Sequence, residues 1–189
     1  MNNVLVHYGV KGMKWGVRRY QNRNGKLTVH GKRRLNANRT RKDVNEIINT
    51  MSNEDRYKVL AGDNEYLQID QGSAVIKRIL KKKGNVPIAF FDMLDDGESI
   101  NVALGVRSGN EYRGKGYASE TVKRGMKWLD MHKDLISDKN VIVWGVRTDN
   151  TPSIKIAKKY GFKYEKGSYN KDKNGYGWVN YTKKLKKNK

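Results

Sequence analysis

The residues with the clearest capacity for chemistry lie in the glycine-rich stretch GNEYRGKGYASE, residues 109–120. Gly114 and Gly116 allow the backbone to approach a ligand closely, and Arg113 and Lys115 add positive charge beside them. Backbone N–H groups at such a turn, followed by the positive end of a helix dipole, bind phosphate without needing a particular side chain. The Gly-Lys-Gly triplet taken alone favours an ordinary glycine turn, so the flanking elements must decide whether a phosphate site is present.

This stretch departs from the two common nucleotide-binding motifs. Gly109-x4-Gly114-Lys115 opens like a Walker A loop, but Gly116 stands where a Ser or Thr would bind magnesium. Gly114-x-Gly116 opens like a dinucleotide fingerprint, but Ser119 replaces the third glycine. The sequence also shows no convincing strand that ends in a magnesium-binding acid. A nucleotide hydrolase is therefore the least supported function.

The elements on either side of the stretch place it between a strand and a helix. Apolar residues alternate with polar or small ones over 100–106, which predicts a strand buried on one face. After the stretch, apolar residues recur with helical spacing from Ala118 to Leu129, which predicts a helix over about 117–133. The nearly continuous apolar run Val141–Val146 predicts a further strand, covered on both faces.

The region before this unit predicts two helices and a hairpin. Residues 44–51 carry apolar side chains on one helical face. Ser52, with Asp55 three residues later, resembles the capping start of a second short helix through Leu60, after which residues 62–64 end it. Residues 74–81 and 87–94 predict two antiparallel strands joined by a Lys-Lys-Gly-Asn turn.

The region after it predicts one more helix and two strands. Thr151 is the expected N-cap of a helix that Gly161 ends. The remaining sequence predicts two strands around a Gly- and Asn-rich turn at 167–177. The complete order of elements predicts a mixed α/β domain and not a repeated doubly wound unit.

Two motifs, correctly spaced, resemble those of one enzyme family. Arg113-x-x-Gly116-x-Ala118, after a strand and before a helix, is similar to the acetyl-CoA pyrophosphate loop of the GCN5-related N-acetyltransferases (GNAT enzymes). The segment that begins at Asn150 and ends in Tyr-Gly-Phe resembles the later helix motif of the same family. The resemblance covers about residues 55–189 and includes the order of elements.

This resemblance implies a fold, a cofactor and a set of binding residues. The fold is the α/β (α+β) mixed sheet of the GNAT enzymes, in which the strand before the loop diverges from the next parallel strand. Acetyl-CoA is the implied cofactor, with its pantetheine arm in the opening and its pyrophosphate on the loop amides. The implied cofactor-binding residues are Leu104, Gly105, Val106, Arg107, Arg113, Gly114, Lys115, Gly116, Tyr117, Ala118, Ser119, Asn150 and Ser153.

The sequence departs from the family at both positions that handle protons. Many members have a glutamate where this chain has Asn101, and a tyrosine general acid where it has Ala157. An acceptor amine must lose a proton, because a lysine of pKa about 10.4 is almost wholly charged at neutral pH. A thiol of pKa about 8.5 leaves with little help, so the missing acid matters less than the missing base. Glu98, Glu111 and Tyr160 are the candidate replacements, although each also fits a solvated or packing role.

Positive charge is concentrated at the N-terminus. The formal net charge is +21, and residues 1–42 hold twelve of the forty Lys and Arg residues and no acid. Aromatic residues and glycines are interleaved with these cations, in a segment too polar to bury much surface. The sequence therefore predicts a basic, flexible arm over 1–42 and an acetyltransferase domain over 43–189. Charge of this density favours a polyanionic partner such as nucleic acid, an acidic protein surface or anionic lipid.

The arm also resembles a segment found in phage proteins. Residues 7–34 are similar to a stretch that recurs in tailed phages and prophages of Gram-positive bacteria, including head-associated proteins. Residues 43–52 resemble the segment that comes after that stretch in such proteins. The resemblance implies a phage origin, a location in the host cytoplasm or the virion, and contact with nucleic acid or capsid through the arm.

The composition makes several kinds of site improbable. The chain has no cysteine, which excludes a disulfide framework and a thiolate nucleophile, and its three histidines are too widely spaced to suggest a metal site. No apolar run approaches the roughly 18 residues of a membrane span. The N-terminus lacks the features of a secretory signal.

Two functions remain open. The first is an acetyl-CoA-dependent N-acetyltransferase of phage origin that modifies an amine of a protein or small molecule, with a protein lysine as a candidate. The alternative is a non-catalytic phage head- or DNA-associated binding protein on a degenerate GNAT fold. In the family that the sequence resembles, the most variable parts of the chain line the acceptor groove, which implies residues 55–70 and 164–178 here. Aromatic candidates to line it are Tyr66, Tyr169, Tyr176 and Trp178.

Overall fold

The computed structural model describes residues 26, 40–60, 75–97, 99–136 and 138–185. The chain divides into two units, Met1–Arg41 and Lys42–Lys189, and the elements of the sheet all belong to the second. The elements are a helix over residues 40–49, α2 (Asn53–Leu60), β1 (Val75–Lys83), β2 (Val86–Asp96), β3 (Ser99–Val106), α4 (Tyr117–Met131), η1 (Lys133–Ile136), β4 (Val141–Arg147), α5 (Thr151–Lys159), β5 (Lys163–Tyr164), β6 (Asn170–Lys171) and β7 (Gly177–Lys184).

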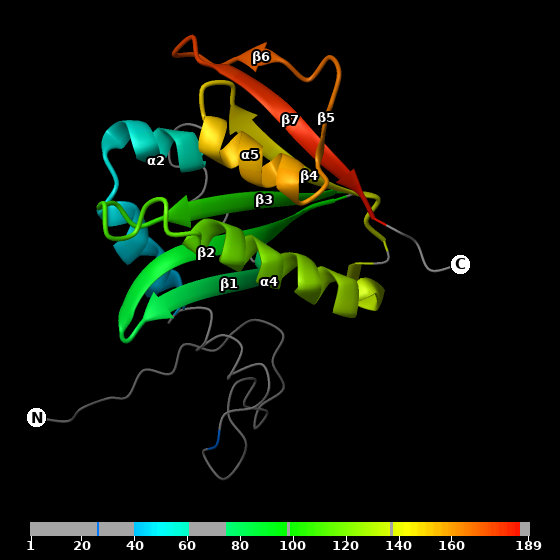
Figure 1. Cartoon of the computed structure of the whole chain (residues 1–189). Coiled ribbons are helices and arrows are strands. Elements are labelled where there is room, and N and C mark those ends of the chain that lie inside the picture. The colour runs from blue at the N-terminus through cyan, green and yellow to red at the C-terminus, as the bar shows by residue number, and fades with distance from the viewer. Residues whose placement is uncertain (1–25, 27–39, 61–74, 98, 137, 186–189) are drawn as a thin grey trace, which may run out of the picture. The chain divides into compact units, whose positions relative to one another are not determined.

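These strands form one mixed sheet in the order β1-β2-β3-β4-β7-β5, with β6 also paired to β7 (Figure 1). The pair β3–β4 is parallel and the other pairs are antiparallel. The predicted mixed α/β fold is confirmed, as are the β1–β2 hairpin and the helix after the glycine loop. The expected end of α2 near residues 62–64 lies outside the described residues.

The two parallel strands separate part of the way along their length. They pair at Ser99–Val141, Ile100–Ile142 and Asn101–Val143, and no later pair joins them among the described residues. Beyond this point β3 remains paired with β2 as far as Val106, and β4 remains paired with β7 as far as Arg147. The sheet therefore opens between β3 and β4, on the side where β3 leads into the glycine loop.

Both faces of the sheet are covered at β2 and β3, which corrects the prediction that β3 is buried on one face. A core on the α4 and α5 side contains Phe91, Trp144 and Phe162 among its buried residues. On the opposite side, the helix over 40–49 packs its apolar face against Phe90 and Ala103. The small residues of β3 permit this second contact. A Cβ added at Gly105, for example, would lie 2.3 Å from the Phe90 ring.

Strand β4 and the end of the chain also differ from the prediction. Alternate residues of β4, at 142, 144 and 146, are buried, but Gly145 between them is exposed, so only one face is fully covered. The first of the two expected terminal strands is only the two-residue β5, and a second short piece of strand, β6, lies inside the expected turn at 167–177. Both pieces pair with β7. Within the described ranges, no helix combines the length and apolarity needed to cross a membrane.

Candidate functional site

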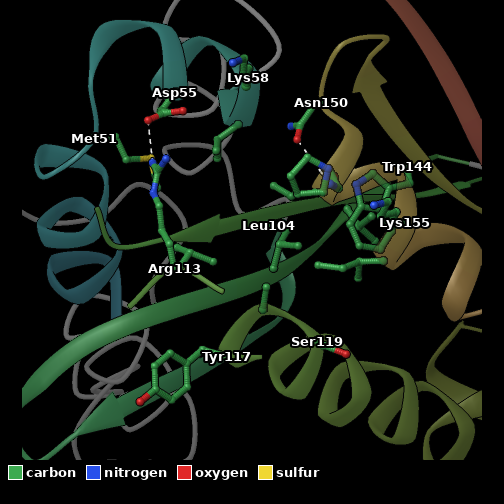
Figure 2. A pocket seen from close by; sticks show the side chains of 18 of the residues that line it. Met51, Asp55, Lys58, Leu104, Arg113, Tyr117, Ser119, Trp144, Asn150 and Lys155 are labelled. Carbon is green, nitrogen blue, oxygen red and sulfur yellow. Dashed lines mark hydrogen bonds and ion pairs between the residues drawn. The ribbon is translucent and has the colours of Figure 1, made fainter. Parts of the chain in front are cut away.

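A cavity of about 630 Å³ occupies the opening between β3 and β4. Its walls come from α2, β3, the glycine loop, the first turn of α4, the end of β4 and α5. Figure 2 shows Leu104 of β3 in the centre, Asn150 and Lys155 on one side, and Asp55 with Arg113 on the other. The separation of two parallel strands thus brings together both motifs that the sequence analysis identified.

The β3 wall presents backbone groups to the cavity. The Arg107 N–H donates to the Ile88 carbonyl across the β2–β3 pair at 2.7 Å. Residues of an antiparallel strand alternate in the side to which their N–H and C=O point, so Gly105 also faces β2. Leu104 and Val106 face the opposite side, toward the opening, and both line the cavity. Of the four residues predicted on this strand, only these two are placed to use their backbone groups.

The glycine loop leaves amide groups available at the start of α4. Gly116, with φ 81°, precedes the helix, and no side chain of the residues that the structure describes caps the helix N-terminus. The first backbone hydrogen bond into the helix runs from the Glu120 N–H to the Gly116 carbonyl at 2.9 Å, so the N–H groups of 117–119 have no intrahelical acceptor. A Cβ at Gly114 or Gly116 would meet no atom within 4 Å. The loop therefore offers open space and unpaired donors, which fit an anionic group.

The predicted loop residues divide into those that reach the cavity and those that do not. Residues that line it are Arg113, Gly114, Gly116, Tyr117, Ala118 and Ser119. Lys115 does not line it. The Arg113 guanidinium donates to the Asp55 carboxylate of α2 at 2.6 Å and to the Ser108 hydroxyl at 3.3 Å. Arg113 thus already has an anionic partner.

Asp55 is a cavity residue that the sequence analysis identifies only as part of a helix start. Its backbone N–H donates to the Ser52 hydroxyl at 3.1 Å, which confirms Ser52 as the cap of α2. Burial raises the pKa of Asp55, but the hydrogen bond and charge of Arg113 outweigh this and leave the pKa below its ordinary value. Nothing local in the sequence links positions 55 and 113, because their contact depends on the packing of α2 over the loop.

The α5 wall carries the second predicted motif. The Asn150 side-chain oxygen accepts a hydrogen bond from the Ser153 N–H at 3.3 Å, which makes Asn150 the N-cap of α5. The prediction of Thr151 as the N-cap is therefore wrong, because Thr151 is already the first helical residue. Asn150 and Ser153 both line the cavity, as do Lys155 and Ile156 further along the helix.

The candidate proton carriers do not converge on the cavity. Glu98 lies outside the described residues, and Glu111 is exposed and is not a lining residue. The Tyr160 hydroxyl donates to the Ser119 carbonyl at 2.6 Å and lies 3.0 Å from the Ser119 hydroxyl, which joins the end of α5 to the first turn of α4. Ala157 is fully buried in the core. A catalytic role for Glu98, Glu111 or Tyr160 stays a prediction.

A second carboxylate that sequence reasoning missed lines the cavity at the end of β4. Asp149 accepts hydrogen bonds from two nitrogens of Arg147, including Nε at 2.9 Å. Arg147 is only 2% exposed, and its guanidinium lies 3.9 Å from the ring centroid of Tyr176. The hydrogen bond from Arg147 lowers the pKa of Asp149 against the opposing effect of burial. The site therefore holds a fixed carboxylate that is ionised at neutral pH.

Two of the aromatic residues expected in an acceptor groove, Tyr176 and Trp178, connect α2 to the end of the chain. Tyr57 of α2 and Trp178 of β7 both donate to the Asp172 carboxylate, at 2.7 and 2.6 Å. Tyr176 packs against Tyr57 with ring centroids 5.4 Å apart. These contacts connect α2 to the β6–β7 hairpin, and neither Tyr176 nor Trp178 lines the cavity. Of the other two candidates, Tyr169 is exposed and does not line the cavity, and Tyr66 lies outside the described residues.

Comparison with protein families gives two matches. Residues 34–163 match the model of the acetyltransferase (GNAT) domain, which covers more than half of the chain. Residues 1–22 match a family of unknown function, DUF7211. No curated protein matches the sequence.

Solved structures resemble the chain in fold. Spermidine N-acetyltransferase from Vibrio cholerae, in complex with CoA and spermine, shares 14% identity over 78% of this chain and 92% of its own, with a TM-score of 0.58. A GNAT-family acetyltransferase from Bacillus anthracis shares 15% identity over 76% and 89%, with a TM-score of 0.55. The chain spans 65% of the length of yncA from Salmonella typhimurium, solved with its cofactor acetyl-CoA, at 17% identity, 58% coverage of this chain and a TM-score of 0.48.

Proposed function

Because this chain belongs to the GNAT acetyltransferase family, we propose that it transfers an acetyl group from acetyl-CoA to a primary amine. One observation carries the proposal. The parallel strands β3 and β4 separate beside a glycine loop whose amides, at the start of α4, lack acceptors. The resulting cavity has hydrogen-bond donors for an anion at one end and an extended strand edge along its length.

The chain's own residues supply binding and orientation. The amides of 114–119 would hold the pyrophosphate, and the backbone groups of Leu104 and Val106 would hold the pantetheine arm. Asn150 and Ser153 would approach from α5. Bound acetyl-CoA supplies an acyl thioester. A fixed N–H of β3 would donate to the carbonyl oxygen, where negative charge develops during attack, and such preorganised donors commonly give the largest single contribution to catalysis.

Many members of the family have a glutamate and a tyrosine that handle the proton of the acceptor amine, and this chain lacks both at the corresponding positions. Asn101 and Ala157 carry no ionisable group. Glu98 and Glu111 are the candidate bases, acting directly or through water, and Tyr160 is the candidate acid. Asp149, which remains ionised, would attract and orient an ammonium group before it loses its proton. A protein lysine fits these requirements as the acceptor.

The N-terminal arm supports a phage origin for the chain. Its resemblance to segments of phage head-associated proteins suggests that the enzyme acts in the host cytoplasm or within the virion. The twelve cations and absence of acids in residues 1–42 favour contact with nucleic acid or capsid. The domain boundary is proposed at residues 42–43, so that the arm locates the enzyme and residues 43–189 perform the chemistry.

The direct test is binding of acetyl-CoA followed by transfer. Calorimetry with the complete chain should show one site, and intact-mass analysis of host and phage proteins incubated with labelled acetyl-CoA should show additions of single acetyl groups. Absence of acetyl-CoA binding would refute the proposal. Binding without transfer to any amine would instead support the non-catalytic alternative, for which the chain would be a head- or DNA-associated binding protein.

Removing the ion pair between Asp55 and Arg113 should increase the affinity of the chain for CoA. Asp55→Asn should strengthen binding of CoA about two- to fivefold, because Arg113 would no longer have to break an ion pair before it contacts a phosphate. An exposed ion pair is worth about 0.2–1 kcal/mol, which sets the size of the effect. Asp43→Asn, which removes a 2.7 Å pair with Lys82 away from the cavity, is the matched control. Weaker binding by Asp55→Asn would mean that Asp55 orients Arg113 for the phosphate.

A further inference from the structure

The cations predicted beside the glycine loop are not the ones that the fold leaves available to the cavity. Lys115 does not line the cavity. Arg113 lines it, but its guanidinium is held by Asp55 at 2.6 Å. Backbone amides of the loop would therefore face the phosphates of a bound cofactor without a free cation from the loop itself.

Two lysines of α5 are candidate cations for these phosphates. Lys155 and Lys159 are one helical turn apart, on the same face of the helix, and both are exposed. Lys155 lines the cavity. Lys159 does not line the cavity itself, but its ammonium donates to the Ser119 hydroxyl at 3.1 Å, and Ser119 lines the cavity from the first turn of α4. Neither lysine forms an ion pair with a carboxylate in the described part of the chain.

Lys159 lies between two helix ends of opposite polarity, the C-terminal end of α5 and the first turn of α4. The N-terminal end of a helix carries partial positive charge, so a lysine ammonium beside the first turn of α4 raises the positive potential there. The hydrogen bond from Tyr160 to the Ser119 carbonyl, at 2.6 Å, keeps the end of α5 against this turn. The fold thus holds the Lys159 ammonium beside the first turn of α4, where an anion bound to the amides of 117–119 would also meet this cation.

We propose that Lys159 and Lys155, with the Ser119 hydroxyl, form a side-chain subsite for a phosphoryl group of CoA, beside the backbone amides of the loop. This inference rests on the proposed function, since it assigns the recognition of the cofactor's phosphates to α5. When the phosphoryl group binds, Lys159 exchanges its neutral hydroxyl acceptor for a charged one. Charge-assisted hydrogen bonds between two ions are stronger than those to a neutral hydroxyl, so the exchange favours binding.

The phosphoryl group would belong either to the pyrophosphate or to the 3′-phosphate of CoA, and dephospho-CoA separates the two. Calorimetry on the complete chain should show that Lys159→Met weakens binding of CoA about tenfold, with Lys159→Arg close to wild type. Lys155→Met should weaken binding less, since the hydrogen bond to Ser119 of α4 comes from Lys159. Lys127→Met, in an exposed lysine of α4 that does not line the cavity, is the matched control and should bind as wild type.

The outcomes are distinct. A loss for CoA but not for dephospho-CoA would place Lys159 at the 3′-phosphate, and an equal loss for both ligands would place it at the pyrophosphate. If the wild-type chain binds CoA and Lys159→Met binds both ligands with an affinity within twofold of wild type, the subsite is overturned but the proposed function is not. Failure of the wild-type chain to bind CoA would overturn the proposed function and the subsite with it. Thermal unfolding of each variant shows whether the fold is retained.

Discussion

Replacing Gly116 with glutamate should abolish measurable binding of CoA, with a loss on the order of 100-fold or more. The Gly116 Cβ position opens onto free space at the start of α4, where the amides of 117–119 lack acceptors. A carboxylate there would occupy these donors itself and repel a phosphate. Loss of two charge-assisted hydrogen bonds, at about 1.5–3 kcal/mol each, is sufficient for an effect of that size.

The same substitution also strains the backbone, so a matched control is needed. Gly116 has φ 81°, and a side chain in this left-handed region costs roughly 1–2 kcal/mol. Gly167, with φ 80° and equally open surroundings, lies in the turn between β5 and β6 and does not line the cavity. Gly167→Glu should lose similar stability on thermal unfolding but bind CoA as wild type. Normal binding by Gly116→Glu would remove the loop amides from the proposed site.

Removing the cation of the buried ion pair in the β1–β2 hairpin should produce the largest loss of stability. Arg78 and Asp92 have side chains that are 6% and 0% exposed, and they form three hydrogen bonds of 2.7 to 3.0 Å. Arg78→Met would leave a buried carboxylate without its cation. We expect the free energy of unfolding, measured with denaturant, to fall by about 3–5 kcal/mol.

Two further variants show whether this loss comes from burial of charge. Lys82, on the same strand, pairs with Asp43, but its side chain is 39% exposed. Lys82→Met should therefore cost less than about 1 kcal/mol. The double variant Arg78→Met with Asp92→Leu should recover most of the loss, because no buried charge remains. A loss from Arg78→Met no greater than that from Lys82→Met would contradict the explanation.

Local sequence patterns mislead at the start of α5 and at the small residues of β3. Asn150 and Thr151 are both good N-cap residues, and only the hydrogen bond from the Ser153 N–H shows that Asn150 is the cap. Ala103 and Gly105 have the spacing of the solvent side of an amphipathic strand. Their small size instead allows the helix over 40–49 to cover that face, because a larger side chain at Gly105 would collide with Phe90.

The residues of an acceptor groove are the hardest part of the site to predict. Tyr176 and Trp178 have the size and polarity of groove-lining residues, yet they connect β7 to α2 through packing and the Asp172 carboxylate. The carboxylate that does line the cavity, Asp149, has the sequence context of an ordinary loop acid. Its partner Arg147 is almost fully buried. The sequence around this strand end does not indicate that burial.

The sequence by itself determined the order of elements, the position of the glycine loop and the relationship to the GNAT enzymes. The first two features depend on periodicity and turn glycines, which are encoded within a few neighbouring residues. The relationship to the GNAT enzymes comes from the resemblance of two motifs to those of the family. Only the tertiary structure decided which side chains meet at the cavity. The contacts of Arg113 with Asp55 and of Lys159 with Ser119 join residues 58 and 40 positions apart. Such contacts depend on how α2 and α5 pack around the opening between β3 and β4, and no local pattern encodes that packing.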